Sequence, residues 1–70
     1  MIGLDARVGR VESFDAERGI GVVVDDAGEA FPFHATAIAD GSRAIAVGAP
    51  VHFELAPGLG RWEAAAITAA

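Results

Sequence analysis

The sequence predicts an all-β domain in which five antiparallel strands close into a small barrel. Short apolar runs dominate the chain, and turn residues (Gly, Pro and Asp) separate them about every eight to twelve residues, which is typical of a barrel or a sandwich. The chain has 70 residues, which suffices for one domain and is too short for two. We therefore treat residues 1–70 as a single domain, with the barrel at about residues 7–68.

The first two strands are expected at about residues 7–14 and at residues 19–24. The second is rich in β-branched residues, which are poor helix formers. Gly19 and Gly21 lie two residues apart on one face of it, which indicates strong bending or a close backbone approach. Residues 25–28, Asp-Asp-Ala-Gly, predict the turn of a hairpin, because Asp side chains accept bonds from their own backbone and Gly tolerates positive φ.

The third strand is expected at residues 30–35. Phe31 and Phe33 alternate with Pro32 and His34, so we expect the two phenylalanines to face the core and the other pair to face outward. Pro32 has no N–H group and cannot donate a ladder hydrogen bond. This strand must therefore lie at an edge or a bulge of the sheet at that point.

The second half of the chain holds one helical turn and two further strands. The turn is expected at residues 36–39, with Thr36 as its N-cap. Residues 51–55, Val-His-Phe-Glu-Leu, show the clearest alternation of apolar and polar residues and predict the fourth strand. Residues 62–68 predict the last strand, although several of them have high helix propensity.

Four segments in this order carry a resemblance to a known family. Residues 9–19 read GRVESFDAERG, residues 18–23 read RGIGVV, residues 31–38 read FPFHATAI and residues 48–58 read GAPVHFELAPG. These segments are similar to the motifs of the bacterial cold-shock domain, which include K-G-F-G-F-I and V-F-V-H-F-S-A-I. The resemblance runs from about residue 7 to residue 67. It implies a five-stranded OB-fold barrel that binds single-stranded RNA or DNA by stacking bases on exposed aromatic side chains of the first three strands.

Most of those stacking aromatics are replaced in this chain. Small or aliphatic residues stand at their positions, namely Ser13, Ile20, Val22, Pro32 and Ala35. Base stacking on an aromatic ring contributes about 1–3 kcal/mol. Because roughly five such partners are lost, we expect binding at least about three orders of magnitude weaker than with the full set.

The candidate nucleic-acid contacts that remain are Arg10, Phe14, Arg18, His34, Arg43, Arg61 and Trp62. The resemblance implies the first four: Arg10 and Arg18 keep two family positions basic, while Phe14 and His34 keep their family identity. Arg43, Arg61 and Trp62 would form a substitute surface if they lie close together. Each of four residues has a second interpretation: Phe14 as the ring that closes the end of the barrel, Trp62 as partly buried packing, Arg43 as a solvated loop charge, and His34 as a surface histidine without a role.

An alternative function is an interaction module that has lost nucleic-acid binding. Ile20, Val22 and Pro32 would then present an apolar patch to a protein partner or to a second copy of the chain. The net charge of −5 favours this alternative, because it repels a phosphate backbone at long range.

Catalysis has little support in the sequence. The chain has no Cys, no Tyr and no Lys, which excludes thiolate, phenol and Schiff-base chemistry. Ser13 and Ser42 have no neighbouring histidine, and His34 and His52 lie in no recognised metal-ligand spacing. We expect a cytoplasmic binding protein that is not an enzyme, has no cofactor or metal, and does not associate with membranes, because no apolar run approaches the roughly 20 residues that span a bilayer.

Overall fold

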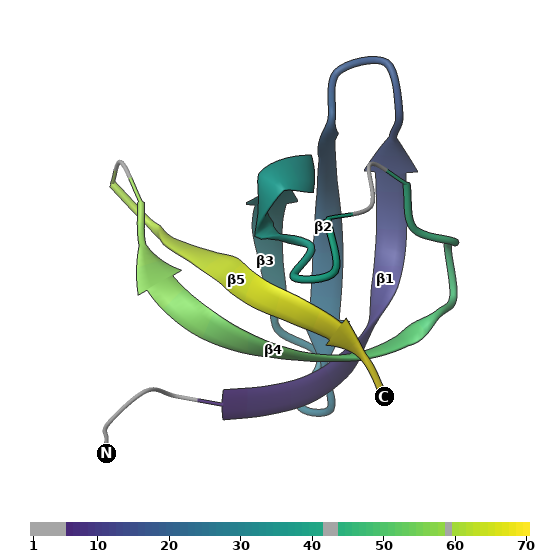
Figure 1. Cartoon of the computed structure of the whole chain (residues 1–70). Helices are drawn as coiled ribbons and strands as arrows, with labels where there is room; N and C mark the ends of the chain where they lie inside the picture. Colours follow the sequence, from purple (N-terminus) through teal and green to yellow (C-terminus); the bar gives the residue numbers. More distant parts are fainter. Residues whose placement is uncertain (1–5, 42–43, 59) are drawn as a thin grey trace.

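The chain is all-β, and its strands form one antiparallel sheet. Figure 1 shows the computed structural model, which describes residues 6–41, 44–58 and 60–70. The elements are β1 (Ala6–Asp15), β2 (Ile20–Asp25), β3 (Ala30–His34), a 3-10 turn η1 (Ala35–Ala37), β4 (Pro50–Pro57) and β5 (Trp62–Ala69). The strand order in the sheet is β3-β2-β1-β4-β5. The five strands predicted from the sequence are confirmed.

The long strand β1 joins two halves of the sheet. Its first half pairs with β4 and its second half pairs with β2, and both ladders include Gly9 and Arg10. A Cβ atom on Gly9 would lie only 2.1 Å from the carbonyl oxygen of Val24, so glycine permits the close approach of the two strands here. A bulge follows between Val11 and Ser13. The bent strand lets β4 and β5 cross in front of β1–β3 (Figure 1).

The hydrophobic core lies between these two halves. Its buried members are Val11, Val23, Phe31, Phe33, Ile38, Val51, Phe53, Leu55, Ala64 and Ile67. The rings of Phe31 and Phe53 meet at a centroid distance of 6.0 Å and an angle of 54°. The predicted inward direction of the two phenylalanines of β3 and the predicted alternation along β4 are both confirmed.

The sheet is not closed. Its edges are β3 and β5, and among the described residues no ladder joins these two strands. They approach each other beyond the end of β3, where Ile38 forms a parallel bridge with Ile67 and the Ala39 N–H donates to the Ile67 carbonyl at 2.8 Å. The described residues thus form an open five-stranded sheet, whereas the sequence predicts a closed barrel.

Pro32 lies on the edge strand β3, opposite Val22, as predicted. Backbone hydrogen bonds donated by Asp25 and Ala35 flank the β2–β3 ladder, and hydrogen-bonded pairs in an antiparallel ladder recur at every second residue. Counted from these two bonds, the pair Val22–Pro32 is one of the non-hydrogen-bonded pairs of the ladder. The backbone nitrogen of Pro32 therefore points away from β2, toward the free edge. Its missing N–H group therefore costs the ladder nothing.

The predicted N-cap role of Thr36 is wrong. The turn η1 begins one residue earlier than expected: its N-cap position is His34, which makes no side-chain capping bond. The Ala35 N–H still extends the β2–β3 ladder by donating to the Gly19 carbonyl. The chain therefore turns directly from the strand, and Thr36 lies within the turn.

The β2–β3 turn is held by the Asp25 carboxylate. Its Oδ1 accepts hydrogen bonds from the backbone N–H groups of Glu29 (2.8 Å) and Ala27 (3.0 Å), which confirms the predicted turn chemistry. Its Oδ2 lies 2.6 Å from Nη1 of Arg7, whose guanidinium sits 5.4 Å from the centre of the Phe31 ring. The Glu29 N–H and Arg7 lower the pKa of Asp25, and burial opposes them in part.

We expect Asp25→Asn to lower the melting temperature at pH 7 by several degrees, because the amide offers Arg7 a donor where it needs an acceptor. The pKa of Asp25 in the folded chain lies below its ordinary value of 3.8. The carboxylate therefore adds stability above that value, and this stability is lost as the pH falls through the folded pKa. Thermal unfolding followed by circular dichroism from pH 7 to about pH 2 should show a weaker acid dependence in the variant.

The exposed neighbour Asp26 provides the control, and Asp26→Asn should keep the melting temperature of the native sequence at pH 7. If Asp25→Asn unfolds at the same temperature and with the same acid dependence as the native chain, the role given to this carboxylate is wrong.

Candidate functional site

The outer face of β1–β3 carries the predicted apolar patch. The register places Val22 between Ser13 on β1 and Pro32 on β3. Ile20 is 39% exposed and lies two residues from Val22, whereas the intervening Gly21 is buried. Ile20, Val22 and Pro32 therefore share the side of the sheet that faces away from the core.

A hollow of about 390 Å³ lies on this part of the sheet. Ile20, Val22 and Pro32 line it together with two acidic residues, Asp15 and Glu63. Glu63 comes from β5, at the other edge of the sheet. The surface is thus aliphatic with acidic groups beside it, which can accommodate apolar or flat groups by contact but offers little attraction to phosphate.

Phe14 packs against the core. Its ring stacks on that of Phe33 at a centroid distance of 5.9 Å and an angle of 9°. Gly21 lies between them in register, and a Cβ atom there would lie 2.7 Å from the Phe33 ring and 2.6 Å from the Ser13 carbonyl oxygen. Phe14 therefore closes the end of the core over a glycine, although part of it also borders the hollow.

The candidate arginines are dispersed around this face. Arg18 lies in the β1–β2 turn with Nε 3.8 Å from Oδ2 of Asp15, an exposed pair that contributes little to stability. Arg10 is exposed on β1, opposite Val24, and so lies toward the other end of the face. Arg61 is exposed just before β5. Arg43 lies outside the described residues.

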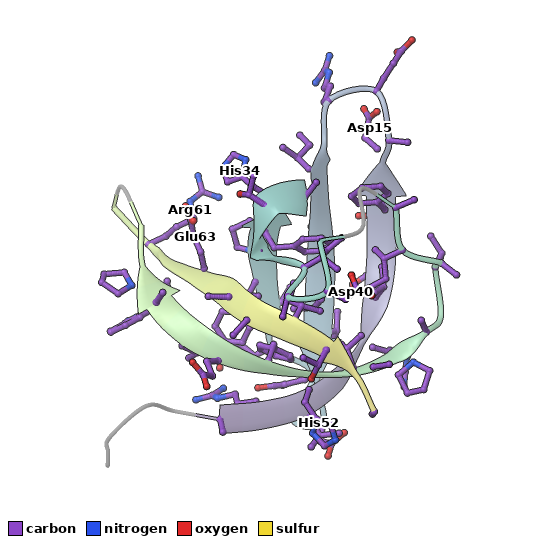
Figure 2. The ribbon with its side chains drawn as sticks, in the orientation of Figure 1. Asp15, His34, Asp40, His52, Arg61 and Glu63 are labelled. Atoms are coloured by element: carbon purple, nitrogen blue, oxygen red, sulfur yellow. The ribbon has the colours of Figure 1, made fainter. Side chains whose placement is uncertain are left out.

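His34 is exposed at the end of β3 and borders two depressions. It lines the hollow described above and a second one of about 610 Å³, which Arg18 and Thr36 also line. The labelled side chains in Figure 2 show Arg61 and Glu63 on the side of the β4–β5 hairpin where His34 lies. Of the sequence-predicted residues, the structure thus brings His34 and Arg18 to one depression, while Arg10 lies apart from them.

Trp62 stands at the end of the β4–β5 ladder. It pairs with Pro57 and is 56% exposed. The alternative interpretation of Trp62 is that it packs partly buried; in the structure less than half of its surface is covered.

Sequence reasoning missed the part that Glu63 plays in the hollow. The residue precedes a run of alanines, and no local pattern distinguishes it from other surface acids. It lines the same hollow as His34 because the edge strands β3 and β5, which are distant in the sequence, lie close together.

No known protein-family profile matches the chain, and no curated protein matches it. Among the described residues, no helix is long and apolar enough to cross a membrane. Within the same ranges, no three His, Asp or Glu side chains are grouped so that they would hold a metal ion.

Proposed function

We propose that the chain is a cold-shock-like OB-fold protein whose outer β1–β3 face binds single-stranded RNA or DNA with low affinity. Support for the fold comes from its strand order, from the bent β1 that is shared by both halves of the sheet, and from the parallel Ile38–Ile67 bridge between its edges. These features suit a five-stranded barrel close to closure.

The observation that carries the proposal is that four residues at positions where the cold-shock family contacts bases lie together on the outer β1–β3 face. Ile20, Val22, Pro32 and His34 lie side by side on adjacent strands and line one hollow. Aliphatic side chains can contact the face of a base, but they lack the stacking energy of aromatic rings. The affinity should therefore be low.

Fluorescence anisotropy of a labelled pyrimidine-rich oligonucleotide at about 50 mM salt tests this proposal. We expect a dissociation constant on the order of 10⁻⁴ M, with binding that weakens as salt rises because phosphate contacts release counterions. The proposal fails if the oligonucleotide shows no binding at millimolar protein.

A second candidate is a protein-binding module, and one observation favours it: Asp15 and Glu63 flank the aliphatic hollow. A segment with apolar and basic side chains would complement that surface. The two candidates predict opposite effects when one acidic group is removed.

For a nucleic-acid ligand we expect Glu63→Gln to raise the affinity by up to about fivefold, because a carboxylate that repels phosphate is lost from a partly exposed position on the hollow. For a basic peptide ligand the same change should weaken binding. Anisotropy titrations of the oligonucleotide and of a basic peptide with native and variant protein show whether Glu63→Gln raises or lowers the affinity for each ligand.

Asp26→Asn serves as the matched control, since it changes the net charge equally but lies in the β2–β3 turn, away from the hollow. If Asp26→Asn and Glu63→Gln change oligonucleotide binding to the same extent, only the net charge matters, and the hollow is not the binding site.

A further inference from the structure

Among the residues that the structure describes, only one aromatic ring has most of its surface in water. The sequence holds four Phe and one Trp. Phe31, Phe33 and Phe53 are buried, and Phe14 is stacked on Phe33. Trp62 is 56% exposed, so it is the ring on which a ligand can stack without disturbing the core.

The hairpin holds Trp62 in a defined position. Its partner Pro57 is the last residue of β4, and the two form the final pair of the ladder. The Gly58 N–H donates to the Arg61 carbonyl at 2.7 Å and closes the loop beyond them. The backbone of Trp62 is thereby held in place, and its side chain loses little conformational entropy when a ligand binds, because tryptophan has only two side-chain torsions.

The cation next to this ring lies on the other side of the strand. Successive side chains of a strand point to opposite faces, and Figure 2 shows Arg61 and Glu63 on the side where His34 lies. In a nucleotide the base and the phosphate extend from opposite ends of the sugar. A strand that crosses the hairpin tip can therefore stack a base on Trp62 while its phosphate meets Arg61.

We infer that Trp62 is the main base-stacking residue of the chain and that Arg61 binds the adjoining phosphate. Stacking has moved from the β1–β3 face, where the outward residues are aliphatic, to the β4–β5 hairpin. This inference rests on the proposed function, because it concerns how single-stranded nucleic acid is held. Stacking accepts any base, so the contact supplies affinity with little sequence preference.

The test compares Trp62→Phe, which keeps an aromatic ring, with Trp62→Leu, which keeps only apolar volume. We expect Trp62→Leu to weaken binding of the labelled pyrimidine oligonucleotide by between about fivefold and 150-fold, and Trp62→Phe to keep most of the affinity. In the native protein the oligonucleotide should quench Trp62 fluorescence. Val8→Ala, at a residue 44% exposed on the β1–β4 half of the sheet, should bind like the native protein.

Circular dichroism shows whether each variant is folded. We expect both Trp62 variants to fold, because Trp62 is mostly exposed. If the native protein does not bind the oligonucleotide, the proposed function fails. If the native protein binds it but Trp62→Leu binds equally well, the role of Trp62 is overturned and the proposed function stands. Quenching by a basic peptide with none by the oligonucleotide also overturns the inference.

Discussion

Replacing Phe33 with alanine is expected to leave much of the protein unfolded at room temperature. The Phe33 side chain is 1% exposed, and a buried Phe→Ala substitution costs about 3–5 kcal/mol. The single hydrophobic core of a domain this small rarely supplies more than about 3–5 kcal/mol of net stability, so the substitution removes most of it. The cost of Phe33→Ala should lie at the upper end of the range for buried Phe→Ala substitutions, because Phe14 loses its stacking partner and the neighbouring Gly21 has no side chain to fill the cavity.

Urea denaturation followed by circular dichroism measures this loss. Ile20→Ala is the control: Ile20 belongs to the outer face, and we expect the change to cost less than about 1 kcal/mol. A cost below about 1 kcal/mol for Phe33→Ala, or a large cost for Ile20→Ala, would mean that the two faces of the sheet have been assigned the wrong way round.

We expect Gly9→Ala to destabilise the fold by about 3 kcal/mol or more, at or above the upper end of the usual cost of overpacking. The new Cβ atom would lie 2.1 Å from the Val24 oxygen and 2.9 Å from the Asp25 Cα. Both atoms are backbone atoms of β2, so relief requires the β1–β2 ladder to move apart just where β1 also pairs with β4.

Gly48→Ala is the control that distinguishes steric crowding at Gly9 from the backbone strain of placing alanine at a positive φ. Gly48 has a φ of 89°, and a Cβ atom added there would have no neighbouring atom within 4 Å. Only the conformational penalty of about 1–2 kcal/mol therefore applies. Equal midpoints in urea for the two variants would contradict the crowding at Gly9.

The features that the sequence predicted correctly depend on short-range patterns. The alternation along β4, the inward direction of Phe31 and Phe33, and the edge position of Pro32 all follow from a two-residue period or from a missing N–H group. The Asp25 turn follows from local hydrogen bonding by a carboxylate. Each of these depends only on residues that are near one another in the chain.

The features that were missed depend on how distant strands meet. Arg7 and Asp25 pair across 18 residues, and neither residue type nor spacing indicates that contact. The stack of Phe14 on Phe33 requires the register of two ladders at once. The place of Glu63 in the hollow that His34 also lines depends on the close approach of the edge strands β3 and β5, which no pattern within either strand indicates.

A ¹H–¹⁵N NMR titration of the native protein with a pyrimidine-rich oligonucleotide at low salt tests most directly whether the outer β1–β3 face and Trp62 bind single-stranded nucleic acid. We predict shifts of the backbone amides of Ile20, Val22 and His34 and of the indole N–H of Trp62, all with one apparent affinity. The result that would contradict the account is a spectrum that does not change at excess oligonucleotide, or one in which the shifts are confined to Val8 and His52 on the other half of the sheet.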